Sequence, residues 1–343
     1  MEALISSVGS LRQQEVFAIN HASDVAAVRR SGQKLADALG FNETRAGQLA
    51  LVITEAATNI LKHAGEGEIH VGPAQSAAGV GIDVLAVDNG PGILDLNASL
   101  VDGVSTTGTS GTGLGALRRL ADEFDVYTKP GGGAAFFMRI WRDVPAPEPC
   151  GVEIGALWVP MAGEDECGDG WAVRCDARGA SLLAADGLGH GPEAARAAAA
   201  AVRALEVSKG GGAGELMQAA HDALRPTRGA ALATARIDFD AGELRFAGVG
   251  NIAGCVIDGS RRALVSHNGI VGHNMRKVQE FALPFPPGAM CIMHSDGIQT
   301  QWDLDKYPGL VGRSPVLVAA ILMRDYIRRR DDAMVLVVRR HGS

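Results

Sequence analysis

Residues 54–65 read TEAATNILKHAG, and this stretch decides the fold of the first half of the chain. Apolar side chains recur at steps of three and four residues, at Leu49, Ile53, Ala56 and Ile60. This spacing predicts a helix over residues 44–64 with one apolar face. Glu55 and Asn59 lie four residues apart on the opposite face, which they share with Lys62. A solvated helix face is the simplest interpretation of such a pair, so its meaning depends on the surrounding sequence.

The rest of the first half mixes helix and strand patterns. Further helices are predicted over residues 22–39 and over residues 113–124, GLGALRRLADEF. Strands are predicted over EIHVGPA, GIDVLAVDNG and GGAAFFMRIW, which are residues 68–74, 81–90 and 132–141. This mixture predicts an antiparallel sheet with helices on one face, an α+β layer.

A proline-rich segment, RDVPAPEPCG at residues 142–151, separates the two halves. Its three prolines within five positions cannot continue a helix or a central strand, so we expect a short, stiff linker. The expected organisation is an N-terminal domain over residues 1–142, a linker over 143–151 and a second domain over 152–343.

Short strands dominate the second half. They are predicted over residues 155–162, 170–176, 179–185, 231–239, 243–248, 253–258, 289–295 and 333–340. One helix begins at Pro192 and runs through the tract AARAAAAAVRAL, because alanine has the best helix propensity, and others are predicted near 214–224 and 315–328. Many short strands with a few helices predict two packed sheets with flanking helices.

Composition narrows the function classes. The 343 residues suffice for about two domains, and 47% of them are apolar, so each half can bury a core. A net charge of -7 argues against nucleic acid and membrane surfaces as partners. The start, MEALISSVGSLRQQE, lacks the features of a secretion signal, and no apolar stretch is long enough to span a membrane. We therefore expect a cytoplasmic protein whose five cysteines are free, buried thiols.

Two further motifs change the meaning of the Glu55 and Asn59 pair. A strand ends at Asp88 and is followed by glycines, and a Gly- and Thr-rich loop over residues 105–120, STTGTSGTGLGALRRL, opens onto a helix. Backbone amides at a helix start can cradle phosphate, although a glycine string alone is a weak signal. A carboxylate at a strand tip can accept a hydrogen bond from an adenine amino group. An amide oxygen suits Mg²⁺, and a neighbouring carboxylate can act as a general base toward a hydroxyl.

These motifs, in this order, resemble the GHKL ATPase (Bergerat) fold. The stretches ITEAATNILKHAGEGEI, DNGPGI and DGVSTTGTSGTGLGALRRLADEF are similar to those of small serine kinases that act as anti-sigma factors or as the stressosome switch kinase, and the likeness covers roughly residues 10–141. The resemblance implies that Glu55 is the base, Asn59 holds Mg²⁺ and Asp88 binds adenine. It also places at the ATP site Lys62, Gly90, Gly92, Thr109, Gly111, Thr112, Gly113, Leu114 and Gly115.

Short stretches with an aspartate beside a glycine or a second aspartate recur in the second half, and we call them acidic corners. They are Asp169 in ECGDGWAV, Asp186 and Gly187 in LLAADGLGHG, Asp296 in CIMHSDGIQT, and Asp331 with Asp332 in RRRDDAMVLVVRR. Each Asp-Gly pair alone more often marks a hairpin turn. Two of the corners follow apolar strands whose ends could converge across a sandwich. Hard divalent cations take several carboxylate oxygens, and two such ions can activate water for attack on phosphate.

The ordered set GD, ADGxGHG, SDGI and DD resembles the bacterial branch of the PPM metal-dependent Ser/Thr phosphatases, over about residues 151–340. That branch includes the sporulation stage II phosphatase and the phosphatase that resets the stressosome. The resemblance implies two Mn²⁺ or Mg²⁺ ions. Asp186 would bridge both ions and Gly187 would bind through its carbonyl, with Asp169 on one ion and Asp296 and Asp331 on the other. Met334 stands where the family usually has Thr, which leaves the choice between Asp331 and Asp332 open.

Together the resemblances imply a bifunctional kinase and phosphatase in a bacterial partner-switching, stress-response pathway. STAS-domain proteins would be the phospho-substrates, with a sigma-factor regulator as a further partner. One alternative is an ATP-dependent sequestering module of the anti-sigma type, against which the intact Glu55 argues. Another is a degenerate phosphatase used as a scaffold, against which the retained acidic positions argue.

Overall fold

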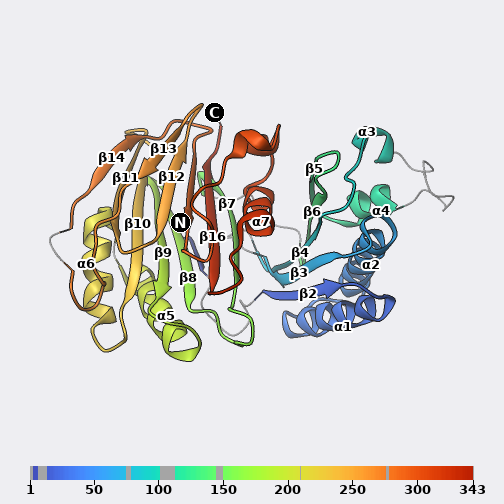
Figure 1. Ribbon diagram of the computed structural model, residues 1–343, viewed down its shortest axis with the longest axis horizontal. Helices are drawn as coiled ribbons and strands as arrows, with labels where there is room; N and C mark the ends of the chain where they lie inside the picture. Colours follow the sequence, from blue (N-terminus) through green and yellow to red (C-terminus); the bar gives the residue numbers. More distant parts are fainter. Residues whose placement is uncertain are drawn as a thin grey trace. The chain divides into compact units, whose positions relative to one another are not determined.

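The computed structural model describes residues 3–6, 14–74, 79–100, 113–143, 150–208, 210–275 and 278–342. The chain divides into two compact units, coloured along the sequence in Figure 1. Residues 144–149 of the expected linker and residues 101–112 of the expected glycine-rich loop lie outside the described part.

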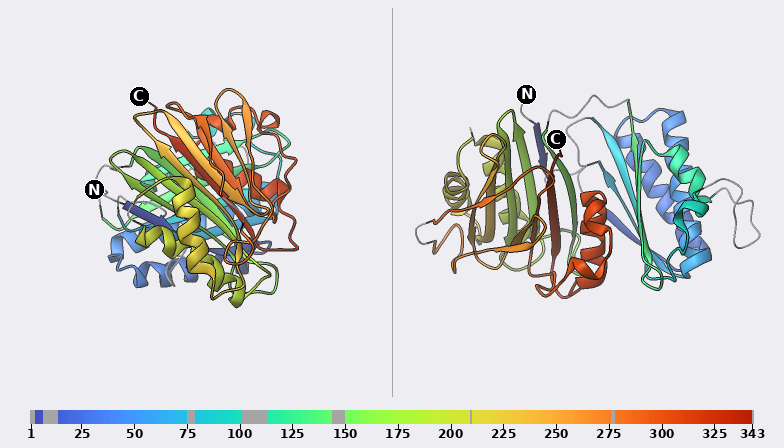
Figure 2. Two further views of the ribbon diagram at one scale, coloured as in Figure 1. Left: turned by 90° about the vertical axis from the view of Figure 1, so that its left-hand side faces the viewer. Right: turned by 90° about the horizontal axis from the view of Figure 1, so that it is seen from above.

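The N-terminal unit is one antiparallel sheet with helices on one face (Figure 2). Its strand order is β2 (Glu15–Ile19), β3 (Gly67–Pro73), β4 (Gly81–Asp88), β6 (Ala134–Trp141) and β5 (Glu123–Thr128). Its helices are α1 (Ala22–Ala38), α2 (Glu43–Asn59), α3 (Leu96–Ser99) and α4 (Gly113–Leu120). The predicted α+β layer is therefore confirmed.

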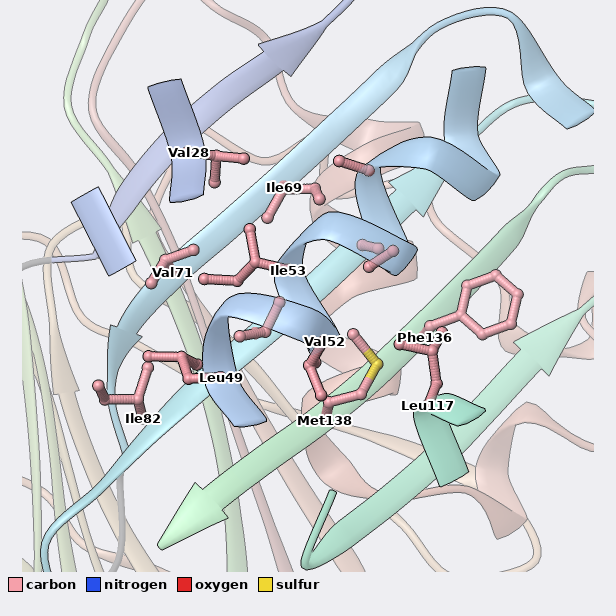
Figure 3. Close-up of a cluster of buried hydrophobic side chains, with 14 of the residues drawn as sticks. Val28, Leu49, Val52, Ile53, Ile69, Val71, Ile82, Leu117, Phe136 and Met138 are labelled. Atoms are coloured by element: carbon pink, nitrogen blue, oxygen red, sulfur yellow. The ribbon is translucent and has the colours of Figure 1, made fainter. Parts of the chain in front are cut away.

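Helix α2 supplies the apolar stripe that holds this layer together. Leu49, Val52 and Ile53 are buried and pack against the inward side chains of the sheet, among them Ile82 and Met138 (Figure 3). At the start of the helix, the Asn42 side chain accepts a hydrogen bond from the Arg45 amide at 2.9 Å, which caps the first turn. Because these buried side chains recur every three or four residues, they occupy one face of α2. The opposite face, which includes Glu55 and Asn59, does not contribute to the core.

Three details of this unit differ from the predictions. The helix expected over residues 44–64 ends at Asn59 and continues as one π-helical turn, Ile60–Ala64. The helix expected to run to residue 124 ends at Leu120, because Asp122 accepts a hydrogen bond from the Trp141 amide and the chain then pairs with β6 as β5. Strand β2 was not predicted. Pairing across the sheet decided the positions of β2 and β5, and local periodicity does not report such pairing.

The C-terminal unit contains two antiparallel sheets. The first has the order β1 (Ala3–Ser6), β8 (Asp169–Asp176), β9 (Gly179–Gly187), β10 (Ala230–Asp238), β11 (Glu243–Val249) and β14 (Phe281–Pro284). The second has the order β13 (Arg261–Leu264), β12 (Ala253–Ile257), β15 (Met290–His294), β16 (Ala333–Arg340) and β7 (Val152–Val159). Strands β1, β13 and β14 are additions to the predicted set.

The two sheets stack face to face as a sandwich. Trp158 of β7 and Trp171 of β8 meet edge to face across the interior, with ring centroids 5.7 Å apart. The alternate side chains, such as Ala172 and Leu183, face outward and are buried in a cluster with residues of α5 (Pro192–Val207) and α6 (Ala213–Leu224). Figure 1 shows these two helices beside the six-stranded sheet. Two packed sheets with flanking helices were predicted, and this architecture is confirmed.

Each half of the sequence contributes a segment to the other unit. Strand β1 from the N-terminus pairs with β8, with Ala3 opposite Cys175. Residues 303–321, which include η2 (Leu304–Lys306), η3 (Leu310–Gly312) and the start of α7 (Pro315–Tyr326), belong to the N-terminal unit. There the Asp125 carboxylate of β5 accepts a hydrogen bond from the Ser314 amide at 2.7 Å and pairs with Arg313 at 3.3 Å.

The cysteines correct one expectation. Cys150 and Cys175 form a disulfide with a Cα–Cα distance of 5.6 Å, so the expectation of five free thiols is wrong for these two. Cys167, Cys255 and Cys291 are free. Within the described residues, no helix has both the length and the apolar character needed to cross a bilayer.

A buried ion pair in the N-terminal sheet generates a stability prediction. Arg139 donates to both oxygens of Asp83, at 2.6 and 2.9 Å, and both side chains are only 8% exposed. Arg139→Met should lower the free energy of unfolding by about 3 kcal/mol, because it leaves a buried carboxylate without its cation. Urea unfolding followed by tryptophan fluorescence measures this change. The double variant Asp83→Leu with Arg139→Met should recover most of the loss, and a single variant as stable as the parent would contradict the argument.

Candidate active sites

One end of the sandwich collects carboxylates from the six-stranded sheet. Asp169, at the start of β8, lies directly opposite Asp186, near the end of β9. Side chains two residues apart on a strand share a face, so Asp169 faces the same way as Trp171, toward the interior between the sheets. The cross-strand register therefore brings Asp186 to the same interior face.

The five-stranded sheet supplies two more carboxylates at this end. Strand β15 ends at His294, just before Asp296, and the adjacent antiparallel strand β16 begins at Ala333, just after Asp331. Asp296 and Asp331 line one cavity of about 660 Å³. Ser295 ties the two sheets together, because its hydroxyl donates to Asp169 Oδ2 at 2.6 Å and accepts from the Met334 amide at 2.9 Å.

The electrostatics of this cluster favour a cation. Burial, together with the negative charges of Asp296 and Asp331, raises the pKa of Asp186 to about 7, against the lowering effect of the nearby Asn251 amide. Burial and the charge of Asp186 also raise the pKa of Asp169 well above its usual value. Several carboxylates that repel one another in a buried place are a donor set for divalent cations, whose charge removes the repulsion.

Geometry separates Asp331 from Asp332. The buried Asp332 carboxylate accepts hydrogen bonds from the Met161 and Gly168 amides, both at 2.8 Å, so it fastens the loop between β7 and β8. The Asp331 side chain is exposed and lines the cavity with Asp296. This arrangement favours Asp331 as the ligand and gives Asp332 a structural role. Gly187 ends β9, where an added Cβ would lie 2.2 Å from the Ala194 carbonyl oxygen of α5.

Two residues of this site were missed by the sequence analysis. Asn251 donates to Asp296 Oδ2 at 2.6 Å and lies near enough to Asp186 to lower the pKa of that carboxyl, so its amide influences carboxylates of both sheets. Ser295 makes the link described above. The available signal was a polar residue directly after a strand, in GVGN after β11 and in HSDG after β15. His190, by contrast, is exposed in a glycine turn and pairs with Glu164 at 2.6 Å.

The residues present fit hard divalent cations that keep part of their water. Among the described residues, no three His, Cys, Asp or Glu side chains stand together as a complete ligand group. Mg²⁺ is commonly held by one or two carboxylates with waters filling the remaining positions. Two carboxylate pairs at this end of the sandwich offer that kind of donor set. One is Asp169 with Asp186, and the other is Asp296 with Asp331.

In the N-terminal unit, α2 presents Glu55 and Asn59 on one face, both half-buried. The Asn59 amide nitrogen is buried and has no hydrogen-bond partner within the described residues. Buried polar groups normally have partners, so an orphaned amide points to a ligand that completes it. The π-helical turn begins at the next residue and leaves Lys62 and His63 exposed, and such turns are frequent at functional sites.

Asp88 ends β4 beside this helix. Its Oδ1 accepts hydrogen bonds from the Gly90 amide at 2.8 Å and from the Ala134 amide at 3.3 Å. A Cβ added at Gly90 would lie 2.7 Å from the Cβ of Ala64, so the loop after β4 presses against the end of the helix. Gly92 has φ +68° and lies against the Lys129 carbonyl, where a side chain has no room.

The structure thus brings Glu55, Asn59, Asp88 and Gly90 to one end of the sheet and helix layer. Gly113, Leu114 and Gly115 open helix α4, as the sequence predicted. Thr109, Gly111 and Thr112 lie outside the described residues. A helix start that follows a glycine-rich sequence is suited to phosphate.

Comparisons with known proteins match the two halves of the sequence to two different families. A family model described as a histidine kinase-like ATPase domain matches residues 19–139, and one described as stage II sporulation protein E matches residues 176–341. The serine/threonine-protein kinase RsbT of Bacillus subtilis (strain 168) is 36% identical over 110 residues, which are 32% of this chain and 83% of RsbT.

Two solved structures resemble part of the chain. One, described as "The bacterial stressosome: a modular system that has been adapted to control secondary messenger signaling", is 34% identical with a TM-score of 0.51, over 55% of this chain and 99% of the other. The other is RsbX in complex with magnesium, 19% identical with a TM-score of 0.50, over 55% of this chain and 94% of RsbX. The second likeness shows a shared fold alone.

The raised pKa of Asp186 generates a pH prediction. Its pKa is about 7 in the folded protein against 3.8 for the free group, so the folded state binds more protons between these values. In protein stripped of metal with EDTA, the free energy of unfolding should therefore fall as pH rises from about 4 to about 7. Asp186→Asn should make this slope shallower, and urea unfolding at a series of pH values measures it. Equal slopes in the variant and the parent would contradict the assignment.

Proposed function

The chain belongs to the histidine kinase-like ATPases and carries a SpoIIE-type PPM phosphatase domain, and we propose that it is a bifunctional regulator of protein phosphorylation. We assign an ATP-dependent serine/threonine kinase to residues 1–142 and a metal-dependent phosphoserine/phosphothreonine phosphatase to residues 152–343, joined by a linker over 143–151. The observation that carries the proposal is the cluster of buried, mutually repelling carboxylates at one end of the sandwich.

The proposed phosphatase chemistry follows from that cluster. Asp186 would be a ligand of both of two Mn²⁺ or Mg²⁺ ions, Asp169 of one, and Asp296 and Asp331 of the other. The position of Asp169 opposite Asp186 and the charges of Asp296 and Asp331 near it support this proposal. Two such ions, when bound, supply an activated water and polarise the phosphate for in-line attack. Ser295 and Asn251 orient the carboxylates by hydrogen bonds to Asp169 and Asp296. The Gly187 carbonyl, at the end of β9, is the proposed backbone ligand.

The proposed kinase chemistry rests on α2 and the loop after β4. Asn59 would hold the Mg²⁺ that accompanies ATP through its amide oxygen, and its buried amide nitrogen, which lacks a partner within the described residues, would donate to an acceptor of the nucleotide. Asp88 would bind the adenine amino group, with Gly90 and Gly92 closing the pocket. Glu55, one turn before Asn59, would accept the proton of the attacking serine or threonine hydroxyl. Lys62 and the residues from Thr109 to Gly115 complete the proposed ATP site.

We propose STAS-domain proteins as the phospho-substrates, within a partner-switching stress response upstream of a sigma-factor regulator. The 36% identity to RsbT and the 34% identity to a chain of a bacterial stressosome structure support this choice. A cytoplasmic location goes with such partners.

A phosphatase test compares a bridging ligand with a ligand of one ion. Asp186→Asn should reduce metal occupancy at both positions and Asp296→Asn mainly at one, and both should lower phosphatase turnover at least about a hundredfold. Metal content by mass spectrometry and hydrolysis of an aryl phosphate measure these effects. ATP binding should survive in both variants, which serves as the folding control. A variant with the parent's phosphatase activity would exclude the proposed two-metal site, and a parent without phosphatase activity would favour the scaffold alternative.

A kinase test separates the base from the nucleotide ligands. Glu55→Gln should bind Mg-ATP with nearly the parent's affinity but lose phosphoryl transfer to a STAS partner, because a base acts on the rate rather than on binding. Asp88→Asn should weaken ATP binding itself. Calorimetry and transfer of labelled phosphate distinguish the two. If Glu55→Gln leaves transfer intact, or if the parent binds ATP and a partner without any transfer, the sequestering module becomes the better description.

A further inference from the structure

The cavity beside the carboxylate cluster contains positive charge that the proposed phosphatase chemistry does not use. Its wall includes Arg328 and Arg330 together with Asp296 and Asp331. Both arginines are exposed, and within the described residues neither guanidinium takes part in an ion pair. Arg324, in the same stretch of chain, is instead paired with Asp325. The cavity beside the proposed metal site is therefore lined by two guanidinium groups that form no ion pair in the described part of the chain.

The backbone fixes these arginines relative to the acidic loop. Ile327 forms an antiparallel bridge with Ile298, and the Arg328 amide donates to the Gly297 carbonyl at 2.8 Å, one residue after Asp296. Arg330 is the direct neighbour of Asp331 in the sequence. Between the two arginines, Arg329 has φ 55°, a left-handed conformation that is uncommon for a residue other than glycine. The turn that presents the arginines is thus held by the same segments that hold the carboxylates.

The charge on the arginines is available to a substrate. In the part of the chain that the structure describes, the Asp296 carboxylate on the same wall is hydrogen-bonded to Asn251, at 2.6 Å, and not to either arginine. Cations bound by the carboxylates would neutralise the negative charge of the cluster. The two guanidinium groups would then give the cavity wall a net positive charge. Guanidinium pairs with carboxylate or phosphate through two parallel hydrogen bonds, so an anion is the matching ligand.

The size of the cavity indicates more than a phosphate ion. A volume of about 660 Å³ lies within the range of small-molecule sites and can take a phosphorylated side chain with its neighbours. Gln299 and Gln301 add amide groups to the same wall, suited to the backbone of an extended peptide. The chain as a whole has a net charge of -7 and repels acidic proteins, so a local basic pair would direct an acidic segment to this place.

We propose that Arg328 and Arg330 form a specificity subsite that binds an acidic side chain next to the phosphorylated serine or threonine of the protein substrate. This inference rests on the proposed phosphatase function and deepens it, since it names the kind of segment that the phosphatase accepts. The phosphoryl group itself goes to the metal side of the cavity and the flanking Asp or Glu goes to the arginine side.

The test uses the whole 343-residue chain with Mn²⁺ and three substrates: an aryl phosphate, a phosphoserine peptide with aspartates flanking the phosphoserine, and a matched peptide with alanines there. Arg328→Gln and Arg330→Gln should each raise KM for the acidic peptide by about tenfold, the loss expected for one charge-assisted hydrogen bond. Turnover of the aryl phosphate and of the alanine peptide should change by less than about twofold. Arg203→Gln, at an exposed arginine on α5 outside this cavity, is the matched control.

A charge exchange makes the test independent of lost folding. The double variant Arg328→Glu with Arg330→Glu should prefer a peptide with flanking lysines over the acidic one, which a merely damaged protein would not do. An equal loss on the aryl phosphate would show that the arginines hold the transferred phosphate and overturn the subsite. Unchanged KM for the acidic peptide would also overturn it. A parent protein that hydrolyses none of the substrates would instead defeat the proposed phosphatase function, so the two failures are distinguishable.

Discussion

The central constraint in this protein is the burial of like charges at the end of the β-sandwich. Asp169 and Asp186 face each other across two neighbouring strands, and neither can ionise there without repelling the other. A fold gains nothing in stability from such a pair by itself. The cluster persists because hydrogen bonds from Ser295 and Asn251 hold it, and because divalent cations would cancel its charge. The strand ends, the loops and the cavity are all arranged around this cluster.

The two candidate sites use different solutions to a similar problem. The sandwich gathers its polar groups from four strand ends in two sheets, so the geometry depends on the packing of those sheets. The N-terminal site takes two groups from one helix and a third from a strand end, so α2 alone sets the spacing of Glu55 and Asn59. A helix fixes such a spacing locally, whereas strand ends converge only in the complete fold.

The exchange of segments between the units bears on how the two proposed activities could be related. Strand β1 completes the edge of the six-stranded sheet beside β8, the strand that carries Asp169. Residues 303–321 follow the Asp296 loop in the chain yet belong to the N-terminal unit, where Arg313 and Ser314 bind Asp125 of β5. The chain therefore joins the units through the N-terminal segment, the linker and the stretch around α7. Cutting the linker would not release two independent proteins.

The sequence by itself determined most of the helices and strands and which polar residues each motif contains. The period of α2, the alternation of the strands and the acid-glycine corners all follow from local patterns, and they predicted both architectures and the acidic positions Asp169, Asp186 and Asp296. Local periodicity did not reveal β1 or β5, because partners distant in the sequence decide strand pairing. It also did not distinguish the π-helical turn after Asn59 from a continuing α-helix. Asp331 and Asp332 are equivalent in the sequence. Only the tertiary structure turned Asp332 toward the Met161 and Gly168 amides and left Asp331 on the cavity, because hydrogen bonds across loops exist only once the sheets have packed.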